Sequence, residues 1–146
     1  MTSRALRVAT LGLALLATQV QAQNQLPSGA DGLTIELNKV EPSDTGGCQA
    51  FFLFRNLTGK SFAGFDMSLA ILDTGGVIDQ LLSIDAAPLP AARTTLKLFE
   101  IPDIACDRIS EILLHDMPSC QPQNEDQMDC FAILDLVSRA GPRLVK

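Results

Sequence analysis

Apolar and polar residues alternate along much of the chain, which is the pattern of β-strands that bury one face. In residues 33–38 and 65–73, nearly every second side chain is apolar. Residues 48–56 (CQAFFLFRN) are apolar on both faces, so we expect them to form a central strand. Turn-forming clusters such as PSDTGG and DTGG separate the segments. The pattern predicts about seven strands, at residues 33–38, 48–56, 65–73, 77–84, 94–101, 109–117 and 130–138.

The last of these segments allows two interpretations. Met128, Phe131, Leu134 and Val137 recur every third residue, a spacing that a helix could use. Phe131, Ile133 and Val137 also fall on one face of a strand. We favour the strand, because short strands with turns at this spacing predict an antiparallel β-sandwich whose last strand closes a sheet.

The first residues carry the pattern of an export signal. Arg4 and Arg7 precede an apolar stretch at residues 8–17, and residues 20–22 (VQA) offer the small side chains that a signal peptidase reads. The apolar stretch is shorter than the about 20 residues that span a bilayer. We therefore expect a periplasmic protein with a cleaved signal peptide at residues 1–22, a flexible lead-in at residues 23–32 and a single β-sandwich domain at residues 33–146.

The chain is acidic, and this excludes several classes of partner. The formal net charge is −6, and it becomes about −8 when the signal peptide with its two arginines is removed. A chain of this charge repels phosphate backbones, and no basic cluster offsets the repulsion. We expect no nucleic-acid binding and no membrane insertion of the mature chain.

The four cysteines predict two disulfides, because an exported chain folds in an oxidising compartment. Cys106 and Cys120 flank a predicted strand of about nine residues, which holds them roughly 30 Å apart. A disulfide needs Cα atoms within about 7 Å, so this pair is excluded. If the seventh strand forms a hairpin with the sixth, Cys130 lies beside Cys120 and far from Cys106. The pairs that remain are Cys48–Cys106 and Cys120–Cys130.

The middle of the chain has a distinctive order of elements. Residues 51–78 (FFLFRNLTGKSFAGFDMSLAILDTGGVI) and 88–98 (PLPAARTTLKL) give a strand, an Asn-containing turn, a strand ending in Asp, a Gly-Gly hairpin and a proline-led strand. This order resembles the immunoglobulin-like modules of bacterial envelope proteins, of the FxLYD type. The whole chain also resembles uncharacterised exported proteins of alphaproteobacteria. The resemblance implies an all-β, immunoglobulin-like antiparallel sandwich, in which the starts of the second and sixth strands meet and suit the Cys48–Cys106 pair.

The stretch HDMPSC (residues 115–120) contains the only histidine of the chain. On a regular strand His115 and Met117 point to the same face and could offer an imidazole and a thioether to copper. This weakly resembles the His-x-Met element of periplasmic copper chaperones. We prefer the interpretation as a strand end followed by a disulfide at Cys120, and we expect no cofactor. A copper-binding protein that uses His115 and Met117 is the alternative function.

Catalytic motifs are missing from the sequence. No Gly-x-Ser-x-Gly elbow is present, and on a strand Asp116 points away from the face of its neighbour His115. A small hydrolase would have to use loop carboxylates, either Asp103 with Asp107 or the acidic residues of the loop at 123–129. We expect no enzymatic activity.

A non-catalytic periplasmic protein that serves as a protein-binding or accessory module of the cell envelope is the expected function. The expected contact surface is the polar loop at residues 123–129 (QNEDQMD), because a disulfide at its base would reduce the entropy lost on binding. The expected partner is an unidentified envelope protein. The candidate contact residues are Gln123, Asn124, Glu125, Asp126 and Asp129.

Overall fold

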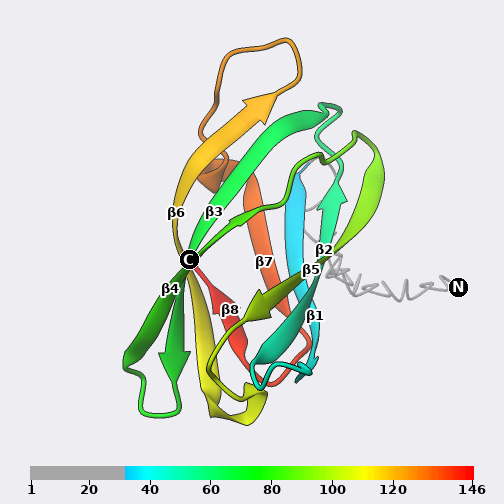
Figure 1. Cartoon of the computed structure of the whole chain (residues 1–146). Helices are drawn as coiled ribbons and strands as arrows, with labels where there is room; N and C mark the ends of the chain where they lie inside the picture. Colours follow the sequence, from blue (N-terminus) through cyan, green and yellow to red (C-terminus); the bar gives the residue numbers. More distant parts are fainter. Residues whose placement is uncertain (1–31) are drawn as a thin grey trace, which may run out of the picture.

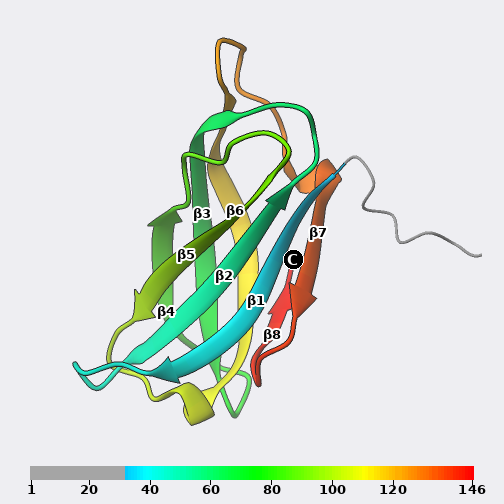
Figure 2. The same cartoon turned by 90° about the vertical axis from the view of Figure 1, so that its right-hand side faces the viewer.

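The computed structural model describes residues 32–146, which form a sandwich of two β-sheets, shown from two sides in Figures 1 and 2. The predicted signal peptide and nearly all of the predicted lead-in lie outside the described residues. In the described part of the chain, no helix is long and apolar enough to cross a membrane. Sheet A contains β1 (Leu33–Pro42), β2 (Cys48–Asn56), β5 (Arg93–Ile101) and β7 (Leu134–Ser138). Sheet B contains β3 (Phe62–Asp73), β4 (Ile78–Asp85), β6 (Ile109–Pro122) and β8 (Arg143–Val145).

The strand order is β5-β2-β1-β7 in sheet A and β4-β3-β6-β8 in sheet B. The pairing of the first, second and fifth strands, and of the third with the sixth, is that of an immunoglobulin-like sandwich. The fourth strand pairs with β3, and the last two strands run parallel to β1 and β6. The predicted all-β sandwich is therefore confirmed, with a distinct arrangement at its C-terminal end.

Alternating side chains of the two sheets meet in one hydrophobic core. As expected for a central strand, β2 lies between β5 and β1, and its Phe52 and Phe54 are buried. The ring of Phe54 meets the edge of Phe65 from β3, at 6.0 Å between centroids and an interplanar angle of 81°. Burying four phenylalanines across the sheets supplies the main driving force for their packing. The largest fully buried side chains are Phe52, Phe54, Phe62, Phe65, Leu33, Ile35, Leu37, Met67, Leu69, Ile71, Leu89 and Ile101.

Both predicted disulfides are confirmed. Cys48–Cys106 has a Cα–Cα distance of 4.9 Å and joins the start of β2 in sheet A to the 3-10 turn η1 (Cys106–Arg108), directly before β6 of sheet B. Cys120–Cys130 has a Cα–Cα distance of 6.1 Å and closes the loop that follows β6. One bridge therefore ties the sheets together, and the other shapes a single loop.

Three expectations about the C-terminal part need correction. The sixth strand does not end at Met117 but continues to Pro122, so Cys120 lies within it. The predicted strand at 130–138 begins with a 3-10 turn, η2 (Phe131–Ile133), and only Leu134–Ser138 is a strand. That strand does not form a hairpin with β6 but crosses to sheet A, where Leu33 of β1 is the register partner of Leu134.

One carboxylate, that of Glu36, is buried among the described residues. It accepts a hydrogen bond from Asn38 Nδ2 at 2.7 Å and forms an ion pair with Arg139 at 3.2 Å. The hydrogen bond from Asn38 and the charge and hydrogen bond of Arg139 hold the pKa of Glu36 below its ordinary value, against the opposing effect of burial. The pair connects β1 to the segment after β7.

Candidate functional site

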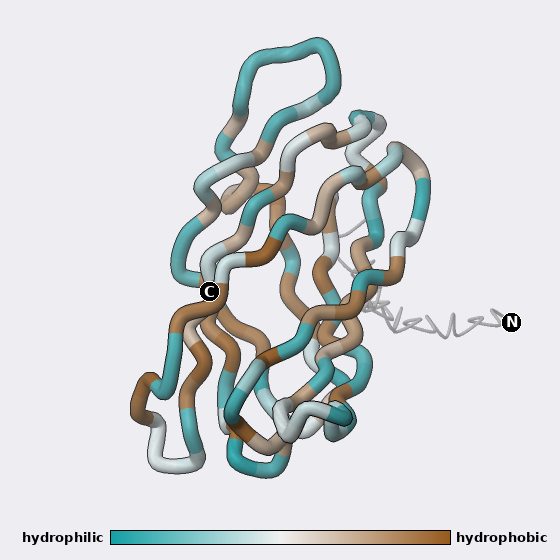
Figure 3. Tube along the Cα trace, viewed as in Figure 1, coloured by the Kyte–Doolittle hydropathy of each residue, from teal (hydrophilic) through white to brown (hydrophobic). Residues whose placement is uncertain are grey.

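The loop that joins β6 to η2, residues 123–129, projects beyond the ends of both sheets (Figure 1). It forms a hydrophilic tip to the molecule, drawn in teal at the top of Figure 3. Gln123, Asn124, Glu125, Asp126 and Asp129 are all exposed, so the structure brings the five candidate contact residues together on one loop.

Covalent and backbone contacts fix the base of this loop. The Cys120–Cys130 disulfide joins its two stems, and the two sulfur-bearing residues are buried. The N–H of Met128 donates to the carbonyl of Cys120 at 2.9 Å, and the N–H of Gln123 donates to the carbonyl of Ser61 at 2.8 Å. Asn124 has a φ of 61°, the left-handed conformation that asparagine tolerates at a turn. The loop is therefore held in shape at its stems.

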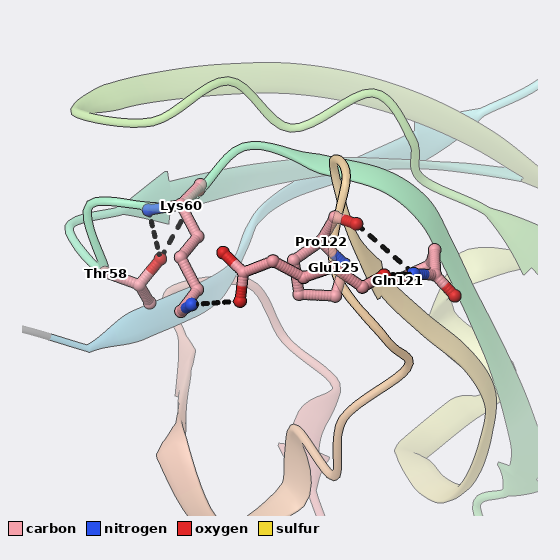
Figure 4. A network of polar contacts seen from close by, with 5 residues as sticks. All are labelled: Thr58, Lys60, Gln121, Pro122 and Glu125. Carbon is pink, nitrogen blue, oxygen red and sulfur yellow. Dashed lines mark hydrogen bonds and ion pairs between the residues drawn. The ribbon is translucent and has the colours of Figure 1, made fainter.

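A neighbouring turn supports the loop from the side, as Figure 4 shows. The ammonium group of Lys60 forms an ion pair with the carboxylate of Glu125. Gln121 Nε2 donates to the backbone carbonyl of the same Glu125. Both partners of the ion pair are substantially exposed, so its contribution to stability is small. Its role is to orient the loop toward the turn.

Asn56 fixes the position of that turn. Its side chain is 1% exposed, and its Nδ2 donates to the carbonyls of Lys60 at 2.7 Å, Leu89 at 3.1 Å and Pro90 at 3.1 Å. Its Oδ1 accepts hydrogen bonds from the backbone N–H and hydroxyl of Thr58. Asn56 thus places Lys60 opposite the loop. Neither residue could be assigned to the site from the sequence, because both lie more than 60 positions from Glu125.

A shallow groove of about 480 Å³ opens at the foot of the loop. Its lining includes Met117, Met128 and Phe131 together with Asp116 and Asp129. Both methionines and the phenylalanine are half-buried against the core, whereas both aspartates are exposed. Apolar walls with carboxylates at the rim suit a side chain that is apolar along its length and cationic at its end.

The structure does not bring His115 and Met117 together as the sequence predicted. Shifts in the β3–β6 register at this point interrupt the alternation of faces, because more residues of β6 than of β3 occupy the segment. His115 is exposed and its Nε2 lies 2.8 Å from the hydroxyl of Ser68, whereas Met117 packs against the core. Among the described residues, no three side chains of His, Cys, Asp or Glu gather in a group that could hold a metal ion.

The other carboxylates considered for catalysis lie elsewhere. Asp103 and Asp107 belong to the connection between β5 and β6, at the end of the sandwich remote from the 123–129 loop (Figure 1). Asp103 has a φ of 60° and is exposed in a turn. Within the loop, Glu125 is paired with Lys60, and the carboxylate of Asp129 accepts a hydrogen bond from the N–H of Phe131 at 2.9 Å. These contacts hold the two carboxylates in place.

Comparisons with protein-family models, with curated proteins and with solved structures find no match for this chain. The functional conclusion therefore rests on the residues of this chain and their geometry.

Proposed function

We propose that this protein is a non-catalytic accessory module of the cell envelope that binds a partner protein through the loop at 123–129 and the groove at its foot. The observation that carries the proposal is that a projecting acidic loop is held in shape by a disulfide and by the turn at Asn56 and Lys60. A loop that is ordered before binding loses less conformational entropy in the complex. Sandwiches of immunoglobulin-like architecture use end loops in this way.

The chemistry of the surface indicates what the partner presents. Asp126 makes no hydrogen bond or ion pair with the other described residues, so its carboxylate is available to a partner. Asp116 and Asp129 flank the apolar wall formed by Met117 and Met128. A lysine or arginine of the partner fits this arrangement, with its alkyl stem on the thioethers and its charge between the carboxylates.

The cysteines and the N-terminal sequence support an exported location. Two disulfides are typical of proteins that are exported and fold in an oxidising compartment. The signal pattern at residues 1–22 supports the periplasm as that compartment, with a mature chain beginning at Gln23. Sequencing of the N-terminus of the protein isolated from cells tests this assignment, and a retained Met1 on a cytoplasmic protein contradicts it.

The binding proposal is tested by removing charge from the loop. Asp126→Asn with Asp129→Asn removes two carboxylates from the proposed surface, and Asp44→Asn with Asp79→Asn removes two exposed carboxylates elsewhere. Each affinity-tagged protein is purified from the periplasm, and the co-purified proteins are quantified by mass spectrometry. We expect at least one envelope protein to be retained by the wild type and the control variant, and to be depleted about tenfold or more with the loop variant, as for loss of a buried charged contact.

Equal retention by the loop and control variants would contradict the use of this surface. Hydrolytic activity of the purified protein that disappears with the loop variant would instead assign the carboxylates to catalysis. Both variants keep the two disulfides, so peptide mapping without reduction verifies that each has folded.

A further inference from the structure

The outer face of sheet A carries a cluster of apolar side chains. In the antiparallel register of β2 and β5, Phe51 lies opposite Leu98, and Leu53 lies opposite Leu96. Residues directly opposite each other point to the same side of the sheet, here the side away from the core. Leu96 and Leu98 are 53% and 46% exposed, and Phe51 and Leu53 are half-buried beside them. We call these four residues the outer apolar patch; its strands lie at the front of Figure 2.

The two ends of this patch carry opposite charges. Arg55 follows Leu53 on the same side of β2 and is exposed. At the other end, Glu100 of β5 lies opposite Gln49 of β2. Hydrogen bonds from Thr45 and from Ser43 lower the pKa of Glu100 and hold its carboxylate in place. Beside the patch, Lys39 of β1 lies over the ring of Phe51 and forms an ion pair with Glu41. The face therefore has an apolar middle, with Arg55 at one end and Glu100 at the other.

We propose that two copies of this chain pack their outer apolar patches together as a symmetric dimer. The two-fold axis of this dimer runs between the two faces, parallel to them and perpendicular to the strands. The strands of one copy therefore run opposite to those of the other. Such an axis places the patches face to face and brings Arg55 of each copy to the end that carries Glu100 of the other. A closed two-fold interface requires a surface that is complementary to itself in this way. An apolar centre with charges at the rim is also the usual anatomy of a protein interface.

The size of the face suits a dimer. The strands β1, β2 and β5 are 10, 9 and 9 residues long and β7 is 5, so at a spacing of about 4.8 Å they cover roughly 20 Å across the sheet and about 30 Å along the three longer strands. Side chains make the accessible surface of this face larger than its flat area. The accessible surface is therefore of the order of the ~800 Å² that each partner contributes to a standard interface.

Other surfaces are less suited to a second copy. Pairing through the free edge of β5 would place the inward-pointing Lys97, whose ammonium donates to the carbonyl of Ala87 at 3.0 Å, against the other chain. An inward lysine at an edge opposes such pairing. On the outer face of sheet B, Leu81 is 64% exposed, but the same face carries Asp79 two residues away on β4 and the opposed pair of Asp66 and Asp85 at the far end of the β3–β4 ladder. Two copies joined there would bring like charges together.

The test is sedimentation velocity of the oxidised mature protein at about 100 µM, where a dissociation constant near 1 µM leaves most of the protein dimeric. We expect Leu96→Glu to raise the dissociation constant of the dimer about tenfold or more, because it places a carboxylate in the apolar centre. Leu81→Glu is the matched control, since it changes an exposed leucine of the other sheet, and it should leave the dimer intact.

A second set of variants tests the relative orientation of the copies. Arg55→Glu alone and Glu100→Arg alone should each weaken the dimer, and the double variant should restore it, because both ion pairs reform with their signs exchanged. Circular dichroism and non-reducing peptide maps show that each variant is folded. If Leu96→Glu does not fold, the charge-exchange variants at Arg55 and Glu100 still test the dimer, because both residues are exposed.

A wild-type protein that sediments as a monomer at this concentration would overturn the proposal. A dimer that Leu81→Glu disrupts and Leu96→Glu leaves intact would also overturn it, and so would a double charge exchange that fails to restore association. The dimer and the loop lie on separate surfaces, so either can fail while the other holds.

Discussion

Removing the Cys120–Cys130 disulfide should loosen the proposed binding loop and destabilise the protein by a calculable amount. The perturbation is the double substitution Cys120→Ala and Cys130→Ala, in which alanine avoids placing a hydroxyl at two positions that are 1% exposed. The bridge closes a short loop, with a sequence separation of 10. Without the bridge, the unfolded chain regains the conformational entropy that closing this loop had removed. The free energy of unfolding should therefore fall by about 3 kcal/mol.

Urea unfolding of the wild type and the variant measures this loss as a difference in the free energy of unfolding. The corresponding removal of Cys48–Cys106, with a sequence separation of 58, should cost about 4 kcal/mol. Hydrogen exchange separates the local from the global effect. The amide of Met128, which donates to Cys120, should lose protection in the loop variant beyond what the global loss explains.

A loss below about 1 kcal/mol would refute the closure argument, because it would mean that the unfolded chain gains little freedom when the bridge is absent. Unchanged protection of Met128 would refute the inference that the disulfide shapes the loop. The variant that lacks Cys48–Cys106 is the control. Its amides in the 123–129 loop should lose only the protection from hydrogen exchange that the fall in global stability explains.

Three further substitutions test other parts of the account. Asn56→Ala should lower the free energy of unfolding by about 3 kcal/mol in urea, because it removes a buried amide that donates to three carbonyls and accepts two hydrogen bonds from Thr58. Met117→Ala should cost about 2 kcal/mol as a core truncation and leave uptake of Cu(I), titrated against a competing chelator, unchanged. Glu36→Gln should be less stable than the wild type at pH 7. The difference should shrink as pH falls below the carboxyl's ordinary pKa of 4.5, because the unfolded chain then binds a proton that the native carboxylate, whose pKa is lowered, does not yet bind.

These three predictions have clear contrary outcomes. An unchanged free energy for Asn56→Ala would show that the turn does not depend on its side chain. Submicromolar Cu(I) affinity that disappears in both His115→Ala and Met117→Ala would make copper binding the leading function. If the difference in the free energy of unfolding between the wild type and Glu36→Gln grew as the pH falls, the ion pair of Glu36 would not stabilise the native state in the way that its lowered pKa implies.

The strands could be predicted where burial alone dictates their pattern. The alternation of residues 33–38 and the two apolar faces of residues 48–56 follow from their places in sheet A, so the sequence was sufficient there. The sixth strand was predicted to end at Met117, directly before Pro118. However, β8 pairs only with Glu111–Leu113, so beyond that point one side of β6 has no partner and a proline removes no ladder bond there.

The C-terminal elements depend on partners that the sequence does not reveal. Residues 134–138 can bury one face in either sheet, and only tertiary packing decides that they pair with β1. β8 is three residues long, too short for its alternation to be recognised, and it is a strand because β6 lies beside it. The loop at 123–129 was predicted from its polarity and its flanking cysteines. Its support by Asn56 and Lys60 was not, since that contact joins segments distant in the sequence.

The measurement that tests the central claim most directly is site-specific photocrosslinking in the periplasm. A photoreactive residue is placed at Asn124 in the projecting loop or, as a control, at Asp44 in the exposed turn between β1 and β2. The account predicts a discrete crosslinked product with one envelope protein from position 124 that is absent from position 44 and is lost when Asp126 and Asp129 are both changed to asparagine. A loop position that gives no product, or the same products as the control position, would contradict the claim that this loop is the contact surface.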